Sequence, residues 1–288
     1  MPRKYLFKAR HYTLDLGKRT YLMGVMNLTP DSFSRDGLLS KRITIRDHLL
    51  IARRLIKEGA DILDIGGEST RPGAAPIDAA EEIKRVIPTI RSIHKSCHVP
   101  ISVDTYKPQV AWAALEAGAD IINTIQGTCL NVDLLAAVKK YKAGIILMHM
   151  RGTPLTMQKK TSYKNIIKEI SRELSKSIAI CLDNGIKKDK IILDPGIGFA
   201  KTVEGNLQII NRLGEFKQLG FPLLIGTSRK SFIGKIINKD VRARAWGGAA
   251  CLAISIARGA NIVRVHDVAA MKDAALTADA ILNEKSKY

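Results

Sequence analysis

The stretch EAGADIIN, residues 116–123, contains the pattern on which the fold prediction depends. It has a glycine, a small residue, a short apolar run and then a polar residue. Gly118 can take the left-handed conformation that ends a helix, and the run after it has the length of a strand. The same order returns in EGADILDIGG at 58–67 and in RGANIVRVH at 258–266. Repeated helix-to-strand junctions of this kind predict βα units and a parallel sheet.

Eight short apolar runs cross the chain, and a polar or charged residue follows nearly every one of them. The residues at or just after these strand ends are Asn27, Glu68 and Thr70, Asp104, Asn123, His149, Asp194, Ser228 and His266. In a (β/α)₈ barrel the carboxyl ends of the strands point into a single mouth, so residues far apart in sequence can share one site. The chain is therefore predicted to be an α/β protein with the (β/α)₈ TIM-barrel fold, and to be an enzyme.

The remaining layout supports one barrel. Segment 4–22 alternates and contains LGKR at 16–19, so we expect a short N-terminal β-hairpin that covers the barrel floor. Apolar residues near the helical period predict a helix at 42–58. Further helices are expected at 78–95, 108–117, 132–142, 162–184, 203–213, 242–258 and 267–284. No linker or low-complexity tract divides the chain, so residues 1–288 are predicted to form a single domain.

Composition indicates a soluble globular protein, since 46% of the residues are hydrophobic and 25% are charged. No apolar run approaches the ~20 residues of a membrane span. The basic start MPRKYLFKARHY lacks the apolar stretch of a secretory signal. Cys97, Cys129, Cys181 and Cys251 form no CxxC pair, which is typical of reduced thiols. We expect a cytoplasmic protein without a membrane partner.

The net charge of +19 has three interpretations: general surface basicity, steering of an anionic substrate, or nucleic-acid binding. The lysines fall in separate pairs at 139–140, 159–160 and 187–188, and do not form one tract. This spacing favours surface basicity, and no nucleic-acid partner is expected.

The loop after the first strand, NLTPDSFSRDG at 27–37, is too long for a simple connection. Asn27 and Asp31 offer oxygen atoms that suit a hard cation or a polar heterocycle. Phe33 adds a large apolar side chain. Turn chemistry alone would also select Asn, Pro, Asp and Ser, so a structural role is the alternative.

The loop after the second strand, GGESTRPG at 66–73, permits close approach of the backbone through its glycines. Thr70 and Arg71 present a hydroxyl and a guanidinium group, which suit an anion or a carboxylate. The alternative is a structural arginine that caps carbonyl groups.

Asp104 and Asp194 end the third and sixth strands, and Asn123 ends the fourth. A single carboxylate at a strand end can simply cap the next helix. Two carboxylates on interior strands need hydrogen-bond donors, because a buried carboxylate without a partner is costly. A flat ligand edge with several N–H groups would supply them.

The seventh strand leads into GTSRKSFIG at 226–234, and the eighth ends in RVHD at 264–267. Arg229, Lys230, Arg264 and His266 therefore gather where (β/α)₈ barrels often bind phosphate. Cations there could stabilise charge on a phosphate leaving group. Surface ion pairs on a basic protein are the alternative.

Together, NLTPDSFS, GGESTRPG, SVDT, LMHMRGTPLTMQ, LDPGIGF and SRKSFIG resemble the dihydropteroate synthase family, folate-pathway enzymes inhibited by sulfonamides. The resemblance covers nearly the whole chain in the family's order. It implies a transferase that condenses (7,8-dihydropterin-6-yl)methyl diphosphate with 4-aminobenzoate, giving 7,8-dihydropteroate and diphosphate. It also implies Mg²⁺ as a cofactor and a homodimer formed through the last helices.

The resemblance also implies roles for individual residues. The pterin diphosphate would be bound by Thr70, Asp104, Asn123, Met148, Asp194, Lys230, Arg264 and His266, with the last two on the diphosphate. The aminobenzoate pocket would be formed by Phe33, Thr70, Arg71, Pro72, Phe199, Ser228, Lys230 and Ser231. Asn27 would help to hold Mg²⁺, and the catalytic residues would be Asp104, Lys230, Arg264 and His266. The implied route is dissociative: diphosphate departs, a pterin-methyl cation forms, and the arylamine attacks it.

The chain departs from the family pattern at three places. Thr124 stands where the family commonly has Asp, Ala200 stands where it has Gly, and the first loop has SRDG at 34–37 where SDGG is common. Two other functions therefore remain open: a pterin-dependent methyltransferase and a non-catalytic pterin-binding protein. SRKSFIG and GGESTRPG favour the synthase over the methyltransferase, which needs neither a diphosphate site nor an aminobenzoate pocket.

Overall fold

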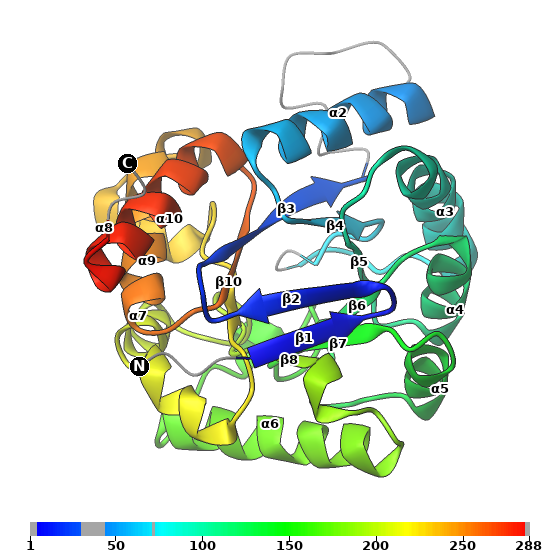
Figure 1. The fold of residues 1–288 in the computed structure, drawn as a ribbon. Coiled ribbons are helices and arrows are strands. Elements are labelled where there is room, and N and C mark those ends of the chain that lie inside the picture. The colour runs from blue at the N-terminus through cyan, green and yellow to red at the C-terminus, as the bar shows by residue number, and fades with distance from the viewer. Residues whose placement is uncertain (1–4, 30–43, 71–72, 286–288) are drawn as a thin grey trace.

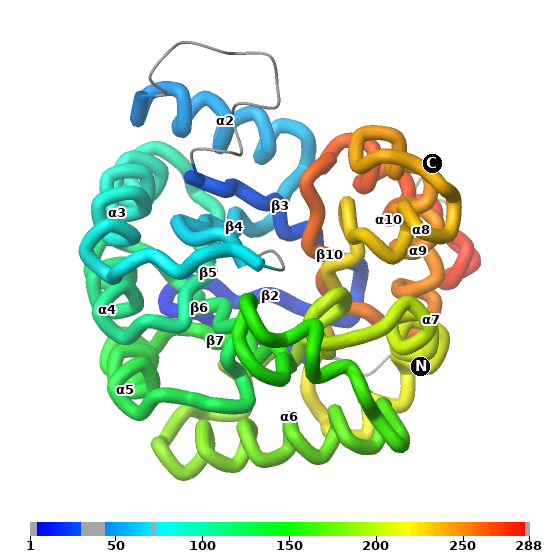
Figure 2. The backbone as a smooth tube through the Cα atoms, turned by 180° about the vertical axis from the view of Figure 1, so that it is seen from behind, coloured from blue at the N-terminus to red at the C-terminus, as the bar shows by residue number. Residues whose placement is uncertain are grey.

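A computed structural model describes residues 5–29, 44–70 and 73–285. Figure 1 shows a barrel of parallel strands enclosed by helices, with a two-stranded hairpin in front of the strands. Figure 2 views the molecule from the opposite side, with the hairpin behind the strands, and shows the helices as a ring. The predicted (β/α)₈ fold is confirmed.

Eight parallel strands form the barrel within the described residues. They are β3 (Tyr21–Asn27), β4 (Ile62–Gly66), β5 (Ile101–Asp104), β6 (Ile121–Thr124), β7 (Gly144–Met148), β8 (Ile191–Asp194), β9 (Leu224–Ile225) and β10 (Ile262–Val265). Their order in the sheet is β8-β7-β6-β5-β4-β3-β10-β9. A bridge between Leu193 and Leu223 joins the two ends of this order, and Leu193 N donates to the carbonyl of Pro222 at 3.0 Å.

The helices lie on the outside of the strands (Figure 1). They are α2 (Ile45–Glu58), α3 (Ala79–Ser96), α4 (Pro108–Ala117), α5 (Val132–Lys140), α6 (Ile166–Asp183), α7 (Val203–Asn211), α8 (Ser231–Ile237), α9 (Ala245–Ala257) and α10 (Val268–Asn283). Short 3₁₀ segments are η2 (Met157–Lys159), η3 (Lys188–Lys190), η4 (Leu213–Leu219) and η5 (Val241–Ala243). Gly59 and Gly118 end α2 and α4 at φ values of 109° and 114°, as their sequence context predicts.

Helix α8 was not predicted, because SRKSFIG was interpreted as a loop. Its seven residues complete about two turns, too few to show a helical period. Helix α6 begins at Ile166, after the expected start at 162, and Asn165 caps it by accepting a hydrogen bond from Lys168 N.

The N-terminal hairpin, β1 (Tyr5–Ala9) and β2 (Tyr12–Leu16), is antiparallel and confirms the predicted floor element. The chain reverses at Arg10 and His11, so LGKR leads from β2 towards β3 and does not form the turn. Hairpin residues Phe7, Ala9 and Leu16 pack against one inward-facing residue from each of seven strands. We call these strand residues the floor layer: Met23, Ile62, Ile121, Ile146, Ile192, Leu224 and Ile262.

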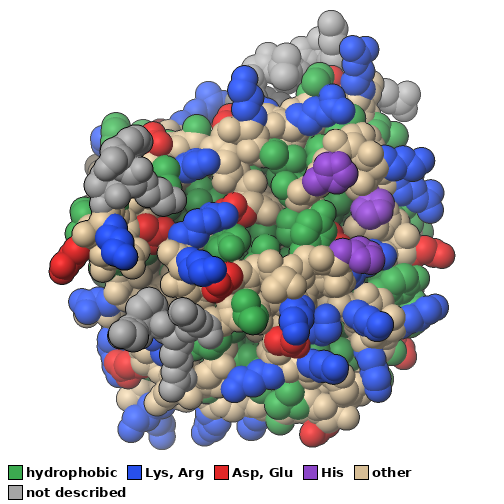
Figure 3. Space-filling view, in the orientation of Figure 1, with side chains coloured by type: hydrophobic (Ala, Val, Ile, Leu, Met, Phe, Trp, Pro, Cys, Tyr) green, Lys and Arg blue, Asp and Glu red, His purple; other side chains and the backbone are tan. Residues whose placement is uncertain are grey.

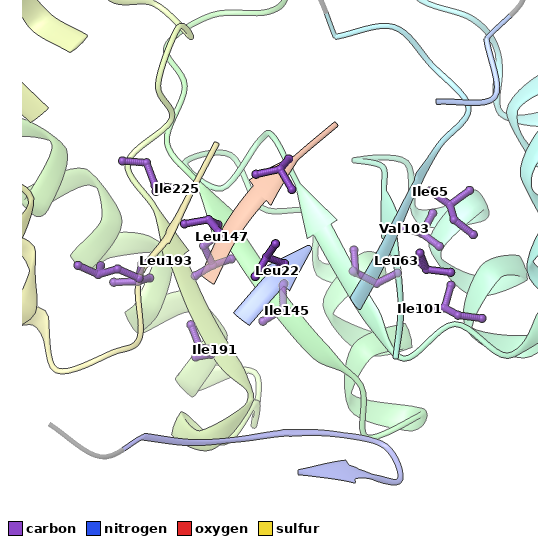
Figure 4. Close-up of a cluster of buried hydrophobic side chains, with 14 of the residues drawn as sticks. Leu22, Leu63, Ile65, Ile101, Val103, Ile145, Leu147, Ile191, Leu193 and Ile225 are labelled. Atoms are coloured by element: carbon purple, nitrogen blue, oxygen red, sulfur yellow. The ribbon is translucent and has the colours of Figure 1, made fainter. Parts of the chain in front are cut away.

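The opposite faces of the strands pack against the helices. Figure 4 shows these outward-facing side chains: Leu22, Leu63, Ile65, Ile101, Val103, Ile145, Leu147, Ile191, Leu193 and Ile225. Successive residues of a strand point to opposite faces, so this outer set fixes which residues point inward.

The surface is basic but mixed. Figure 3, in the orientation of Figure 1, shows lysine and arginine side chains scattered over this face and interspersed with acidic ones. Among the described residues, no helix is both long enough and apolar enough to span a membrane.

Candidate active site at the carboxyl end of the barrel

The inward-facing side chains of the barrel strands change from apolar to mostly polar within two residues of the floor layer. Ile62, Ile121, Ile146, Ile192 and Ile262 are each followed, two positions later, by an inward-facing residue of the site. We call these residues, together with Asp104 of β5, the mouth layer: Asp64, Asp104, Asn123, Met148, Asp194 and Arg264. The period of the strand therefore directs six side chains from six strands into the barrel interior, on the carboxyl-terminal side of the floor layer.

Arg264 connects three of these strands. Its Nε donates to Asp64 Oδ2 at 2.6 Å, and its Nη2 donates to Asp104 Oδ2 at 3.1 Å. Asn123 Nδ2 donates to the two oxygens of Asp64 at 3.4 and 3.3 Å. The Asp64 side chain is 0% exposed, so Arg264 provides the charge that allows it to be buried.

Asp104 has one carboxylate oxygen that can still accept a hydrogen bond from a ligand. Its Oδ1 is buried and has no hydrogen-bond partner within the described part of the chain. Burial raises the pKa of Asp104 to about 7, although Arg264 acts in the opposite direction. Burial tends to lower the pKa of Arg264, but the attraction of Asp64 and Asp104 outweighs it and the pKa is raised. A ligand N–H group directed at Asp104 would satisfy the free oxygen.

Asp194 lies on β8 beside an apolar wall. Its Oδ1 accepts a hydrogen bond from Gly196 N at 2.7 Å, and burial raises its pKa. The wall is a buried cluster of Ile125, Met148, Met150, Met157, Phe199 and Ala200. A carboxylate next to apolar side chains suits a flat heterocycle whose edge donates hydrogen bonds.

Lys230 lies over this wall, with its Nζ 4.1 Å from the centroid of the Phe199 ring. Burial and the nearby Arg264 lower the pKa of Lys230 to about 8. The amine is therefore still mainly protonated at pH 7. Phe199 and Lys230, both expected at the site from sequence, lie in contact.

The four basic side chains expected after the last two strands differ in their surroundings. The backbone N of His266 lies 3.2 Å and its Nδ1 3.1 Å from Ser228 Oγ. Burial, with Arg264 and Arg229 nearby, lowers the pKa of His266 to about 3, so the imidazole is neutral at pH 7. Arg229 is paired with Asp267 at 2.6 Å. Lys230 and Arg264 are thus the two of the four that carry charge into the mouth.

The other expected residues have varied positions. Asn27 ends β3, and the strand register continues from Asn27 through Gly66 and Asp104 to Asn123. Thr70 is partly exposed after β4, and Ser231 is exposed at the start of α8. Phe33, Arg71 and Pro72 lie outside the described residues.

Sequence reasoning missed Asp64, the principal partner of Arg264. The signal was the single carboxylate in the apolar run ILDIG at 62–66, because a charged residue in a buried parallel strand needs a partner. It also missed Glu68, which was noted only as a strand-end residue. Glu68 accepts hydrogen bonds from Tyr106 OH at 3.0 Å and Ile77 N at 3.2 Å, and forms an ion pair with Lys107. Glu68 therefore ties the second loop to the segment after β5.

The family model described as "Pterin binding enzyme" matches residues 23–266. The chain belongs to the pterin-binding enzyme family. Dihydropteroate synthase from Synechocystis sp. is 48% identical over 268 residues, covering 93% of this chain and 92% of that protein.

Solved structures of this family have the same fold. The Yersinia pestis dihydropteroate synthase in complex with a sulfonamide drug has a TM-score of 0.90 at 39% identity, covering 96% of this chain and 99% of that one. The Xanthomonas albilineans dihydropteroate synthase with 4-aminobenzoic acid has a TM-score of 0.89 at 38% identity, covering 97% and 99%. The predicted family and the prediction that the chain is a transferase are confirmed.

Two departures from the family pattern leave the mouth layer intact. Thr124 pairs with the outward-facing Leu147, so it lies on the opposite face of β6 from Asn123. Its hydroxyl accepts a hydrogen bond from Gln126 N at 3.3 Å. Ala200 keeps a left-handed backbone at φ 52°, and its carbonyl accepts from Tyr163 OH at 3.1 Å. The third departure, at 34–37, lies outside the described residues.

Proposed function

We propose that the chain condenses (7,8-dihydropterin-6-yl)methyl diphosphate with 4-aminobenzoate to give 7,8-dihydropteroate and diphosphate. The observation that carries the proposal is the mouth layer, where Arg264 lies between Asp64 and Asp104. Acceptors for a heterocycle and cations for a leaving group thus occur together. The relatives named as dihydropteroate synthases support the same reaction.

The pterin would be held by its polar edge. A pterin has an amino-pyrimidine edge that donates several hydrogen bonds, and Asp194 together with the free Oδ1 of Asp104 can accept them. Asn123 would add an amide from the same layer, and the thioether of Met148 would pack on the ring. A site of this kind rejects ligands that lack the matching donors by about 10⁴-fold.

The diphosphate would lie near the cations. Arg264 and Lys230 would attract its negative charge, which grows as the C–O bond breaks. Because His266 is neutral, it would contribute a hydrogen bond and no charge. Thr70 would contribute a hydroxyl from the second loop.

The aminobenzoate would enter beside Phe199 and Lys230, with Ser228 and Ser231 near it. Thr70 and the residues Phe33, Arg71 and Pro72 would complete this pocket. An arylamine is neutral at pH 7 and already nucleophilic, so no strong base is needed. Its nitrogen forms the new C–N bond to the pterin methylene carbon, and its extra proton then leaves to solvent. Exclusion of water from the mouth would protect the pterin-methyl cation, which water would otherwise consume.

The oxygen donors of the site suit a Mg²⁺ ion that is bound mainly through its substrate. Among the described residues, no group of three or more His, Cys, Asp or Glu side chains could hold a metal. Mg²⁺ often binds through one or two protein oxygens together with substrate phosphates, and Asn27 at the end of β3 could supply one such oxygen. The residues therefore fit a Mg²⁺ ion that arrives with the diphosphate. When bound, the ion would neutralise charge on that leaving group.

We also propose a cytoplasmic homodimer. The four cysteines are free thiols, consistent with a reducing compartment. Helices α9 and α10 carry exposed apolar side chains, with Trp246 86% exposed and Ile281 70% exposed. Sedimentation equilibrium should give a dimer for the wild type and a monomer for Trp246→Glu. A wild type that stays monomeric at micromolar concentration would contradict the homodimer.

The decisive experiment follows dihydropteroate and diphosphate release by the purified chain. Both products should form only when Mg²⁺, the pterin diphosphate and 4-aminobenzoate are all present. Tight binding of the pterin diphosphate with no product would indicate the non-catalytic binder. Methyl transfer from a methylated tetrahydrofolate to a corrinoid acceptor would indicate the methyltransferase.

A further inference from the structure

A chain of ionisable side chains, two of them buried and two partly exposed, lies next to the Asp194 loop, and the mechanism above does not use it. Lys201 is 4% exposed, and its Nζ lies 3.1 Å from Nδ1 of His149 and 2.8 Å from the carbonyl oxygen of Phe199. His149 is fully buried, and its Nε2 lies 2.9 Å from Glu173 of α6. Glu173 also accepts hydrogen bonds from Arg151, one of them from Nε at 3.1 Å.

The hydrogen bonds in this chain have one consistent direction. Burial favours the protonated form of Glu173, but hydrogen bonds from His149 and Arg151 outweigh it and lower the pKa to about 2. An ionised carboxylate only accepts, so His149 carries its proton on Nε2. Burial and Lys201 lower the pKa of His149 to about 4, which keeps the ring neutral. Nδ1 is then an acceptor, and Lys201 is the donor to it.

The same elements hold the loop that carries Asp194. His149 N donates to the carbonyl of Asp194 at 2.9 Å, and Gly196 N donates to the Asp194 side chain. A side chain at Gly196 would be impossible, since its Cβ would lie 2.0 Å from the carbonyl oxygen of His149. Lys201 reaches back to Phe199 in this loop. The loop is therefore fixed on one side by His149 and on the other by Lys201.

We propose that Lys201 is a positioning residue for the pterin site, whose buried ammonium group fixes the Phe199 carbonyl through a direct hydrogen bond and keeps Asp194 in its ionised, ligand-accepting form. The proposal rests on the proposed function, because the ligand of Asp194 is taken to be the pterin. Lys201 acts through Asp194 and Phe199 and is not assigned a contact with the substrate.

The electrostatic setting gives the direction of the effect. Lys201 faces Asp194 of β8 and Glu173 of α6, and also the cations Lys230 and Arg151. Burial lowers the pKa of Lys201 to about 7, against the attraction of Asp194. Burial raises the pKa of Asp194, while the Gly196 hydrogen bond and the cations Lys230, Lys201 and Arg264 oppose that rise. Loss of the Lys201 charge should therefore raise the pKa of Asp194 further. Ligand binding to ionised Asp194 would then be lost at a higher pH.

The test is calorimetric binding of the pterin diphosphate to the full chain between pH 5.5 and 8, without aminobenzoate. Relative to the wild type, Lys201→Met should weaken binding about tenfold near pH 6 and less at pH 8, with the acid midpoint about one pH unit higher; the fall that Asp104 causes is common to both proteins and cancels in this comparison. Lys201→Arg retains the charge and should restore most of the affinity. Lys176→Met removes an exposed lysine of α6 with the same change in net charge, and should match the wild type.

Two results would overturn the role of Lys201. One is an equal loss of affinity for the pterin diphosphate at every pH, with an unchanged acid midpoint of binding. That result would indicate a merely structural role. The other is normal binding by Lys201→Met. Failure of the wild type to bind the pterin diphosphate would instead refute the proposed function itself.

A second measurement does not depend on how the variants fold. Selective ¹³C labelling of lysine would follow the Lys201 side chain by NMR in the wild type, with and without the pterin diphosphate. Coupling between sites is reciprocal, so the bound ligand, which keeps Asp194 ionised, should raise the pKa of Lys201. An unchanged Lys201 titration on saturation with the ligand would contradict the proposal.

Discussion

The floor layer and the mouth layer of the barrel share five strands, on which their residues lie two positions apart, yet their chemistry differs. The floor layer is apolar and fully enclosed by the hairpin residues Phe7, Ala9 and Leu16. The mouth layer holds a partly buried arginine, three carboxylates, an amide and the thioether of Met148. The floor can contribute hydrophobic stabilisation, whereas the mouth keeps charges that are costly to bury unless each has its partner. Stability and ligand recognition are thus separated along each strand.

The largest expected effect comes from breaking the mouth layer at Arg264. Arg264→Ala leaves buried Asp64 without its partner, which should cost about 3–5 kcal/mol of unfolding free energy. It should also lower kcat at least about 100-fold, because the leaving group loses a cation. KM for aminobenzoate should change far less; an equal loss in both would count against the assigned role. The double variant Asp64→Asn/Arg264→Met should recover stability in urea unfolding without recovering turnover.

The matching change in the floor layer is Ile146→Ala. Ile146 is fully buried, so the cavity should cost about 3 kcal/mol in urea unfolding. The Kd for the pterin diphosphate should stay unchanged. Met148→Ala, two residues along the same strand, is the control and should weaken that Kd about tenfold. Equal effects of the two variants on Kd would refute the division between the layers.

Asp194→Ala tests the mouth layer without disturbing the Arg264 ion pairs. Loss of its accepted hydrogen bonds should weaken pterin diphosphate binding about 100-fold, as measured by calorimetry. KM for aminobenzoate in variants with residual activity should change much less. Normal pterin affinity would remove Asp194 from the site.

A smaller effect is expected from pH. The pKa of Asp104 is raised to about 7, so its ionised form is lost as the pH falls through that value. Pterin affinity should therefore fall about tenfold per pH unit below pH 7 until another group titrates. Asp104→Asn should bind more weakly at pH 8 and show a flatter profile between pH 6 and 8. A wild-type profile that is flat over this range would contradict the prediction.

The smallest effect concerns Ala200, whose left-handed backbone is one that glycine adopts without strain. Ala200→Gly relieves that strain but increases the entropy of the unfolded chain, so the unfolding free energy should change by less than about 1 kcal/mol. Activity should be retained. A large gain in kcat would show that Ala200 impairs the site.

Much of the barrel could be predicted because local signals repeat. The glycine stops at Gly59 and Gly118 and the strand-end residues Asp104, Asn123 and Asp194 are visible in short windows of sequence. The partner of Arg264 could not be found that way, because Asp64 lies 200 residues away and only the closed barrel brings the two together. Glu173 looks like an ordinary solvated residue of α6 in the sequence, and its contact with His149 depends on tertiary packing.

The protonation states of the site residues could not be predicted from the sequence either. The sequence placed His266 in one group with Arg229, Lys230 and Arg264, whereas burial and the nearby Arg264 and Arg229 lower its pKa to about 3. A residue type gives the functional group, whereas its protonation depends on surroundings that form only on folding.

The joint between β8 and β9 has a consequence for the local stability of the barrel. β9 has two residues, and its side of this joint is held by the single Leu193–Leu223 bridge, whereas β3 and β4 pair along five residues. Strand pairs with few backbone hydrogen bonds open more readily than long ones, so the β8–β9 pairing should open before the other strand pairs of the barrel. Asp194 ends one side of this joint and Ser228 follows the other. Amide exchange should therefore be faster at Leu193 and Leu224 than at Leu63, and equal rates at the three positions would contradict this expectation.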